Sequence, residues 1–277
     1  MRLYSRSASL GLLWLVAAVS LYGADKPITV ALPPDGLSHE ERAPLQVYLT
    51  KQMGQQVNFV YPNSYIETLE GLGNGTYDYA LLGALTYVRA HAKYGVVPLV
   101  QRDVDVEFHA VFITGMLSSI HSLKDLKGKQ FAFGDVNSTS GHLIPYRELK
   151  KAGIDSETDL KFRYSGGHPL TAKLVETGTV DAGVLDESVY NSLIAGGKID
   201  RTKVRIFYTS KPFVDYVYVA RKSAPDAERD KFSRAFQSLK EGKDDQVLKI
   251  LRAKRYLPAN DGEYSTIRQI AKDLKML

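Results

Sequence analysis

Short apolar runs alternate with helix-length segments along most of the chain. Three such runs and the segments between them lie in the first hundred residues (runs 28–32, 57–61 and 77–82; segments 38–53, 65–72 and 86–93). Repeated alternation of strand and helix is typical of a mostly parallel sheet with helices packed against it. The first part of the chain therefore predicts an α/β unit.

A second unit follows an extended stretch at 107–114 and repeats this alternation. Its expected elements are strand 131–133, a helix near 138–149, strand 161–164, helix 169–177 and strand 180–185. Another extended stretch, 216–221, ends it, and helical segments then return to the first unit (227–240, 244–253 and 263–275). The pattern predicts two lobes with a cleft between them, the first formed by residues 25–113 plus 215–277 and the second by residues 114–214.

The first 24 residues differ in composition from the rest. Arg2 and Arg6 precede an apolar run, Leu10–Leu21, and small residues accompany and follow its end. This order is typical of a secretory signal peptide, and the run is short for a membrane span. We predict that residues 1–24 are a signal peptide cleaved near residues 20–24, with an uncleaved anchor as the alternative.

The 277-residue chain contains no cysteine. Disulfides, thiolate metal sites and cysteine nucleophiles are therefore excluded, as is the lipid-accepting cysteine that tethers many exported bacterial binding proteins. The formal charge is +5, and removing residues 1–24, which hold two arginines and no acids, lowers it to +3. Because this charge is mild and forms no basic run, nucleic acid is not an expected partner. A soluble protein of the periplasm is favoured.

The stretch Phe131–Tyr146, FAFGDVNSTSGHLIPY, carries the most specific chemical signal. A short apolar strand ends at Gly134, and Ser138, Thr139 and Ser140 then open a helix. The first backbone N–H groups of a helix lack partners within it and carry the positive pole of its dipole. Three hydroxyls beside those groups predict an anion-binding site, and the alternative is an ordinary Ser/Thr helix cap.

Other candidate residues lie outside the carboxyl ends of strands, where open α/β sheets bind ligands. Gly83 and Ala84 follow one strand, His168 follows a Ser-Gly-Gly loop, and Asp186 follows another strand. Tyr65 comes after Pro-Asn-Ser and is expected to face the cleft. The simpler alternatives are an exposed turn residue for His168, a helix cap for Asp186 and core packing for Tyr65.

Four segments of the sequence resemble the periplasmic phosphonate- and phosphite-binding proteins of ABC importers. They are PNSYIETLEGLGNGTYDYALLGALTYV (62–88), GDVNSTSGHLIPY (134–146), SGGHPLTAKLVETGTVDAGVLD (165–186) and SKPF…VARK (210–222). The resemblance extends over nearly all of residues 28–256. It implies a type II periplasmic-binding fold whose lobes close over a small oxyanion, with an ABC transporter permease as partner.

The resemblance also implies roles for particular residues. The groups that hold the oxyanion are those of Ser138, Thr139, Ser140 and His168. Tyr65 is implied as an aromatic residue that closes the cleft, and Asp186 as part of the pocket lining. The extended crossings near 108–114 and 207–217 are the expected hinges.

The chain departs from this family at two places. The sequence PFVDYV (212–217) stands where relatives carry a proline-rich loop beside the ligand's substituent, and Gly83-Ala84 replaces Gly-Pro or Gly-Asn. A carboxylate near the pocket, Asp186 or Asp215, would repel a fully ionised anion and accept a hydrogen bond from a protonated oxygen or an amine. We therefore hypothesise a ligand that carries a proton or an amine; phosphate, sulfate and arsenate remain alternatives.

Two other functions are alternatives to transport. A binding protein that reports an oxyanion to a membrane histidine kinase would have the same pocket, so this alternative stays open. An exported phosphate-ester enzyme is disfavoured, because HExxH, HxH, GxSxG and GxxxxGK[ST] motifs are absent. No metal or cofactor is expected, and the other histidines, His142 among them, have no setting comparable to that of His168.

Overall fold

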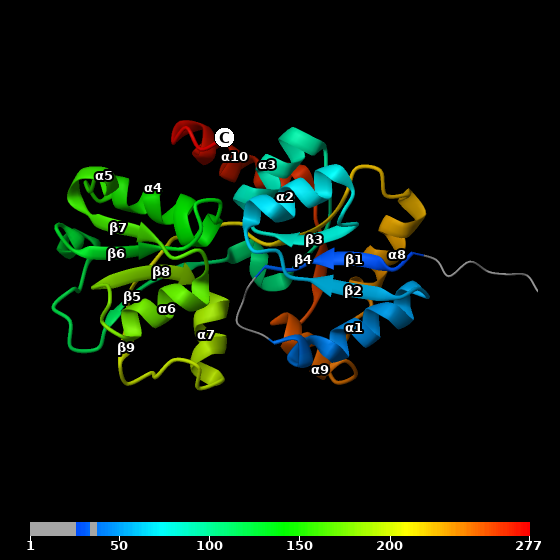
Figure 1. Ribbon diagram of the computed structural model, residues 1–277, viewed down its shortest axis with the longest axis horizontal. Coiled ribbons are helices and arrows are strands. Elements are labelled where there is room, and N and C mark those ends of the chain that lie inside the picture. The colour runs from blue at the N-terminus through cyan, green and yellow to red at the C-terminus, as the bar shows by residue number, and fades with distance from the viewer. Residues whose placement is uncertain (1–25, 34–37) are drawn as a thin grey trace, which may run out of the picture.

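The computed structural model describes residues 26–33 and 38–277, so the predicted signal peptide lies outside the described residues. Within this part of the chain, six strands form one sheet and five form another (Figure 1). The first sheet has the spatial order β11 (Tyr256–Pro258), β4 (Val97–Arg102), β10 (Val217–Ala220), β3 (Tyr79–Leu82), β1 (Ile28–Ala31), β2 (Val57–Val60). The second has the order β7 (Lys161–Tyr164), β6 (Gln130–Phe133), β8 (Ala182–Asp186), β5 (Ala110–Gly115), β9 (Val204–Thr209).

Most strands of each sheet point in one direction. β1 pairs in parallel with β2 and β3, whereas β10 is antiparallel to both β3 and β4. In the second sheet β6 pairs in parallel with β7 and β8, and β5 is antiparallel to β8 and β9. The strands that run against the majority, β10 and β11 in the first sheet and β5 in the second, make both sheets mixed. The predicted two-lobed α/β fold is confirmed.

Helices cover both faces of each sheet. In the first lobe, α1 (His39–Met53), α8 (Asp226–Gln237) and α9 (Asp245–Leu251) pack on one face, and α2 (Tyr65–Asn74), α3 (Ala84–Tyr94) and α10 (Ser265–Asp273) on the other. In the second lobe, α6 (His168–Glu176) and α7 (Glu187–Ala195) cover one face, and α4 (Ile144–Lys151) the other, with the short α5 (Ser156–Asp159) beside β7. Figure 1 shows the second lobe on the left. No helix within residues 26–33 and 38–277 is long and apolar enough to cross a bilayer.

Helix ends follow local sequence signals. Ser38 and Glu41 form a capping box before α1, in which the Glu41 amide donates to Ser38 Oγ over 3.2 Å. The helix ends at Gly54, whose φ of 63° lies in the left-handed region that glycine tolerates best. Ser64 Oγ caps α2 by accepting from the Glu67 amide over 3.2 Å, and this cap places Tyr65 in the first turn.

Two chain segments cross between the lobes and lie side by side. The first includes the 3₁₀ helix η1 (Asp103–Glu107), and the second joins β9 to β10. Phe108 and Phe213 exchange backbone hydrogen bonds of 2.8 and 3.0 Å, and the Asp215 amide donates to the Asp105 carbonyl over 3.0 Å. These bonds fix the position of Asp215 relative to the first crossing.

A buried ion pair lies where the first crossing begins. Arg102 Nε donates to Asp105 Oδ2 over 2.8 Å, and its Nη2 donates to Asp105 Oδ1 over 2.7 Å. The guanidinium also lies over the rings of Phe108 and Tyr216, at 5.7 and 5.3 Å from their centroids. The pair therefore holds side chains of both crossings together.

Replacing Arg102 by methionine should leave the Asp105 carboxylate buried without its partner. Removing one member of a buried ion pair typically costs about 3–5 kcal/mol, so we expect the free energy of unfolding in urea to fall by about that amount. The exposed pair Lys93–Glu70 provides the control: Lys93→Met should leave the urea midpoint nearly unchanged. Equal losses in the two variants would contradict the structural role of Arg102.

Candidate functional site

The candidate residues chosen from the sequence meet between the two lobes. They come from the start of α2, the start of α3, the loop after β6, the start of α6, the end of β8 and the second crossing: Tyr65, Gly83, Ala84, Ser138, Thr139, Ser140, His168, Asp186 and Asp215. All are buried, and the hydroxyl, imidazole and carboxylate groups among them are on residues only 1–6% exposed. Water is therefore largely excluded from a region rich in polar atoms.

The first turn of α3 connects the two lobes. Its N-cap, Gly83, supplies no side chain, and the following amides donate outward: Ala84 N to Asp215 Oδ1 and Leu85 N to Thr139 Oγ1, each over 2.9 Å. A Cβ at Gly83 would lie 3.1 Å from Thr139 Oγ1. The glycine thus lets the loop after β6 approach the positive end of this helix closely.

Ser138, Thr139 and Ser140 lie at the N-terminus of a helical segment, as predicted. Ser138 is its N-cap, and Ser138 Oγ accepts a hydrogen bond of 3.0 Å from the Gly141 amide. The segment begins with a π-helical turn, Thr139–Leu143, and continues as α4; single π-helical turns are frequent at functional sites. The Ser140 hydroxyl is buried and has no hydrogen-bond partner among the described residues.

His168 begins α6 with its ring buried. The Asp186 amide points to Nδ1 over 3.3 Å, and the Tyr216 hydroxyl lies 3.4 Å from Nε2. Because a backbone N–H only donates, Nδ1 acts as the acceptor and the ring proton of the neutral imidazole lies on Nε2. That N–H group is a donor suited to an anionic oxygen.

Asp186 is both a helix cap and a candidate pocket residue. Its Oδ1 accepts from the Val189 amide over 2.9 Å and from the Ser188 hydroxyl over 2.8 Å, so the capping alternative is correct for that oxygen. Its Oδ2 is buried without a hydrogen-bond partner among the described residues. The carboxylate therefore has one oxygen available to a ligand.

Asp215 lies in the second crossing and is buried, with only 1% of its surface exposed. Burial raises its pKa to about 8, an effect that the hydrogen bond from the Ala84 amide opposes and the nearby Asp186 carboxylate increases. Its Oδ2, like that of Asp186, lacks a partner in the described part of the chain. Near neutral pH this carboxyl group is therefore largely protonated and can donate a hydrogen bond.

Two tyrosines complete the polar surroundings. Burial raises the pKa of Tyr65, with Asp135 and Asp215 adding to the effect, while the Ser138 hydroxyl beside it opposes the shift. Burial also raises the pKa of Tyr216. Both phenols keep their protons at neutral pH and can donate. The sequence did not place Tyr216 here, and its position next to Asp215 was the only signal for it.

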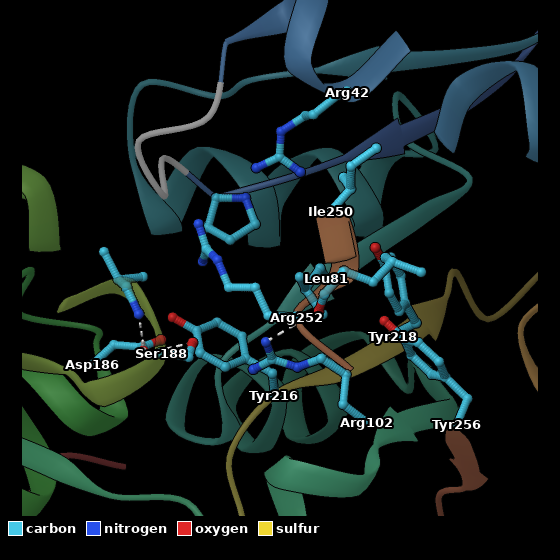
Figure 2. A pocket seen from close by; sticks show the side chains of 13 residues that line it. Arg42, Leu81, Arg102, Asp186, Ser188, Tyr216, Tyr218, Ile250, Arg252 and Tyr256 are labelled. Carbon is cyan, nitrogen blue, oxygen red and sulfur yellow. Dashed lines mark hydrogen bonds between the residues drawn. The ribbon is translucent and has the colours of Figure 1, made fainter. Parts of the chain in front are cut away.

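A narrow cavity adjoins the site on the side of Asp186. It has a volume of about 30 Å³, and Leu81, Asp186 and Tyr216 are among its lining residues (Figure 2). This space suits one water molecule or a methyl-sized group. Through shared lining residues, Ser188 among them, the cavity adjoins a wider groove of about 760 Å³ between α1, α7 and α9.

The site offers hydrogen-bond donors and no set of metal ligands. No group of three or more His, Asp or Glu side chains within the described ranges could hold a metal ion. Hydroxyls of both lobes, an imidazole N–H and helix N-termini can together surround a tetrahedral oxyanion.

A two-lobed α/β fold with a buried, hydroxyl-rich site between its lobes defines the class of periplasmic binding proteins. Residues 35–264 match the family described as "ABC transporter, phosphonate, periplasmic substrate-binding protein". The chain belongs to this family, as the sequence resemblance predicted.

Particular relatives agree with this assignment. A probable ABC transporter phosphite-binding protein of Prochlorococcus marinus is 29% identical over 244 residues, covering 83% of this chain and 82% of that protein. A phosphate-import protein of Mycolicibacterium smegmatis is 28% identical over 242 residues, covering 77% and 75%. The solved structure of the Prochlorococcus marinus protein PhnD1 in complex with methylphosphonate has a TM-score of 0.83 and 27% identity, and the match covers 91% of this chain and 99% of that one.

The raised pKa of Asp215 predicts a pH dependence of stability. The folded-state pKa of about 8 exceeds the ordinary value near 3.9, so the folded state binds the proton more tightly. This group's contribution to stability is therefore greatest below about pH 4 and is lost as pH rises to about 8. Asp215→Asn removes that loss, and its unfolding free energy relative to wild type should rise by a few kcal/mol between pH 5 and pH 8. Urea denaturation without ligand measures this; a constant difference would contradict it.

Proposed function

We propose that this protein captures phosphite or a phosphonate with a small substituent between its lobes and delivers it to an ABC transporter. The observation that carries the proposal is the convergence of the Ser138–Ser140 hydroxyls with His168 and Tyr65, all buried, at a helix N-terminus. Family membership supports the class of ligand, because the family is one of substrate-binding proteins for phosphonate transport.

The donors suffice for tight binding without a lysine or arginine in contact. Ser140 Oγ, His168 Nε2 and the Tyr65 hydroxyl can each donate to an oxygen of the anion. Hydrogen bonds to a charged partner contribute about 1.5–3 kcal/mol each, and a dissociation constant of 1 μM corresponds to about 8 kcal/mol. Four or five such bonds therefore reach micromolar affinity or better.

The small cavity supports a small substituent. Its volume of about 30 Å³ accommodates the hydrogen of phosphite or the methyl group of methylphosphonate. A longer substituent requires the lobes to separate toward the groove between α1, α7 and α9. The names of the two relatives, which refer to phosphite and phosphate, and the methylphosphonate complex support a compact phosphorus oxyanion.

The two buried carboxyl groups take different roles in the proposal. Asp215, largely protonated near neutral pH, donates to the anion. Asp186 keeps one oxygen as an acceptor, and this oxygen favours a ligand with a protonated oxygen or an amine over sulfate.

The family and the N-terminal sequence support a periplasmic setting. We propose that residues 1–24 direct export to the periplasm and are removed there. The two lobes then close over the ligand by movement at the two crossings, which contain η1 and the segment between β9 and β10. Delivery to a transporter is preferred to signalling to a histidine kinase, because the family and the two relatives described above belong to transport. We propose no enzymatic activity.

Calorimetric titration of the mature protein, refolded to remove bound ligand, tests this function. The panel contains phosphite, methylphosphonate, 2-aminoethylphosphonate, phosphate and sulfate. We expect tight binding of phosphite or methylphosphonate and weaker binding of sulfate. Absence of binding across the panel would contradict the proposed function.

Ser140→Ala should weaken binding of the best ligand by about tenfold to hundredfold, the equivalent of one hydrogen bond to a charged group. The fold should be unaffected, because no described residue bonds to this hydroxyl. Ser156→Ala is the matched control, since Ser156 Oγ is also buried without a partner but lies at α5, away from the site. Equal affinities in the Ser140→Ala and Ser156→Ala variants would show that Ser140 does not contact the ligand.

Asp186→Asn should relax the discrimination against sulfate. The asparagine oxygen can still cap α7, whereas the negative charge is lost. We expect the ratio of phosphite to sulfate affinity to fall several-fold in calorimetric titration. Asp155→Asn, which alters the cap of α5 outside the site, should leave the ratio unchanged. If the ratio of phosphite to sulfate affinity is unchanged in Asp186→Asn, residues other than Asp186 discriminate against sulfate.

A further inference from the structure

His142 lies in the helical turn that follows Ser138, in the segment that we call the anion-binding loop (residues 134–143), and is only 3% exposed. Its Nδ1 is 2.8 Å from the Val136 carbonyl oxygen, and its Nε2 is 2.9 Å from the Tyr164 hydroxyl. The carbonyl can only accept, so Nδ1 carries the proton and donates to it. Burial lowers the pKa of His142, which keeps the ring neutral, and Nε2 therefore accepts from Tyr164.

The two partners of this imidazole come from different segments of the second lobe. Val136 lies between β6 and Ser138, in the loop that presents the three hydroxyls. Tyr164 is the last residue of β7, directly before the Ser-Gly-Gly loop that leads to His168. The two strands are already paired in parallel. The backbone carries this pairing one step further, because the Gly166 amide donates to the Gly134 carbonyl over 3.3 Å. The imidazole adds a side-chain link between these segments, which supply Ser138–Ser140 and His168 to the proposed ligand site.

Aromatic rings hold the imidazole in place. Phe133, Tyr146 and Tyr164 pack edge-on against it, with ring centroids 5.4, 5.9 and 5.0 Å away. His142 also belongs to the π-helical turn that contains Thr139 and Ser140. A shift of the ring would therefore be transmitted to the backbone of the anion-binding loop.

We propose that His142 is a positioning residue that holds the Ser138–Ser140 loop and the His168 loop in register through its two hydrogen bonds. The proposal rests on the proposed function for the ligand, although the geometry of the loops is independent of it. His142 does not contact the ligand; it reduces the freedom that the donors would otherwise lose on binding.

A set of variants tests this role by calorimetric titration with methylphosphonate. His142→Phe keeps an aromatic ring and removes both hydrogen bonds, and we expect about tenfold weaker binding. Tyr164→Phe removes only the hydroxyl of a half-exposed ring and should weaken binding a few-fold. Because His142→Phe already removes the hydrogen bond to Tyr164, the double variant His142→Phe/Tyr164→Phe should bind no more weakly than His142→Phe alone. His142→Asn, whose amide can donate to Val136, should recover part of the affinity.

Tyr146→Phe is the matched control. Its ring also packs against His142, but its hydroxyl makes no hydrogen bond to that residue among the described contacts. Affinity should be unchanged. Equal losses in Tyr146→Phe and Tyr164→Phe would show a general packing effect and would overturn the proposal, as would wild-type affinity in His142→Phe.

Hydrogen exchange of the unliganded protein gives a readout that needs no ligand. The amides of Gly141 and Leu143, which bond to Ser138 Oγ over 3.0 Å and to its carbonyl oxygen over 3.1 Å, should exchange faster in His142→Phe, while amides of α2 should not. Unchanged exchange would overturn the proposal. If the wild-type protein binds no member of the oxyanion panel, the proposed function fails and exchange alone decides the role of His142. If His142→Phe does not fold, Tyr164→Phe decides it by the same two measurements.

Discussion

Every feature of the site follows from one constraint, the burial of polar groups at an interface that excludes water. A buried donor or acceptor without a partner is costly, so most such groups here are bonded across the interface or within their own helix ends. The Ala84 and Leu85 amides bond to Asp215 and Thr139, and the Val189 amide bonds to Asp186. The exceptions identify where a ligand is expected: Ser140 Oγ, Asp186 Oδ2 and Asp215 Oδ2 have no partner among the described residues.

This constraint requires a rigid framework, because a hydroxyl displaced by an ångström would no longer reach the anion. The framework has two parts. The Arg102–Asp105 pair holds the crossings together and lies against Tyr216, which neighbours His168. On the other side, His142 connects the two loops of the second lobe. We propose that the ligand binds between these two parts of the framework.

The sequence predicted those parts of the molecule whose signals are local. An apolar strand, a glycine and three hydroxyl residues identify a helix N-terminus, and the structure places Ser138–Ser140 there. Strands without a clean apolar run were missed: β4 contains Pro98 and ends in Gln101 and Arg102, and β11 has only three residues. Their pairing partners are distant in the chain, so a local pattern could not reveal them.

The roles that escaped prediction depend on contacts between distant segments. The Arg102 guanidinium packs on the ring of Tyr216 only because the two crossings run side by side. The positioning role proposed for His142 depends on its hydrogen bond to Tyr164, 22 residues away in the sequence. Nothing in the local sequence distinguishes His142 from an ordinary core histidine. Asp186 shows the opposite case, since the two alternatives, helix cap and pocket residue, apply to different oxygens of the same carboxylate.

We propose that a phosphorus oxyanion binds between the lobes at the hydroxyl-rich helix N-terminus. A crystal structure of the mature protein with methylphosphonate tests it most directly. We expect the phosphonate oxygens to lie within hydrogen-bond distance of Ser140 Oγ, His168 Nε2 and the Tyr65 hydroxyl, with the methyl group toward the small cavity beside Asp186. A phosphonate bound elsewhere, or one whose oxygens contact none of these three groups, would overturn the proposed binding mode.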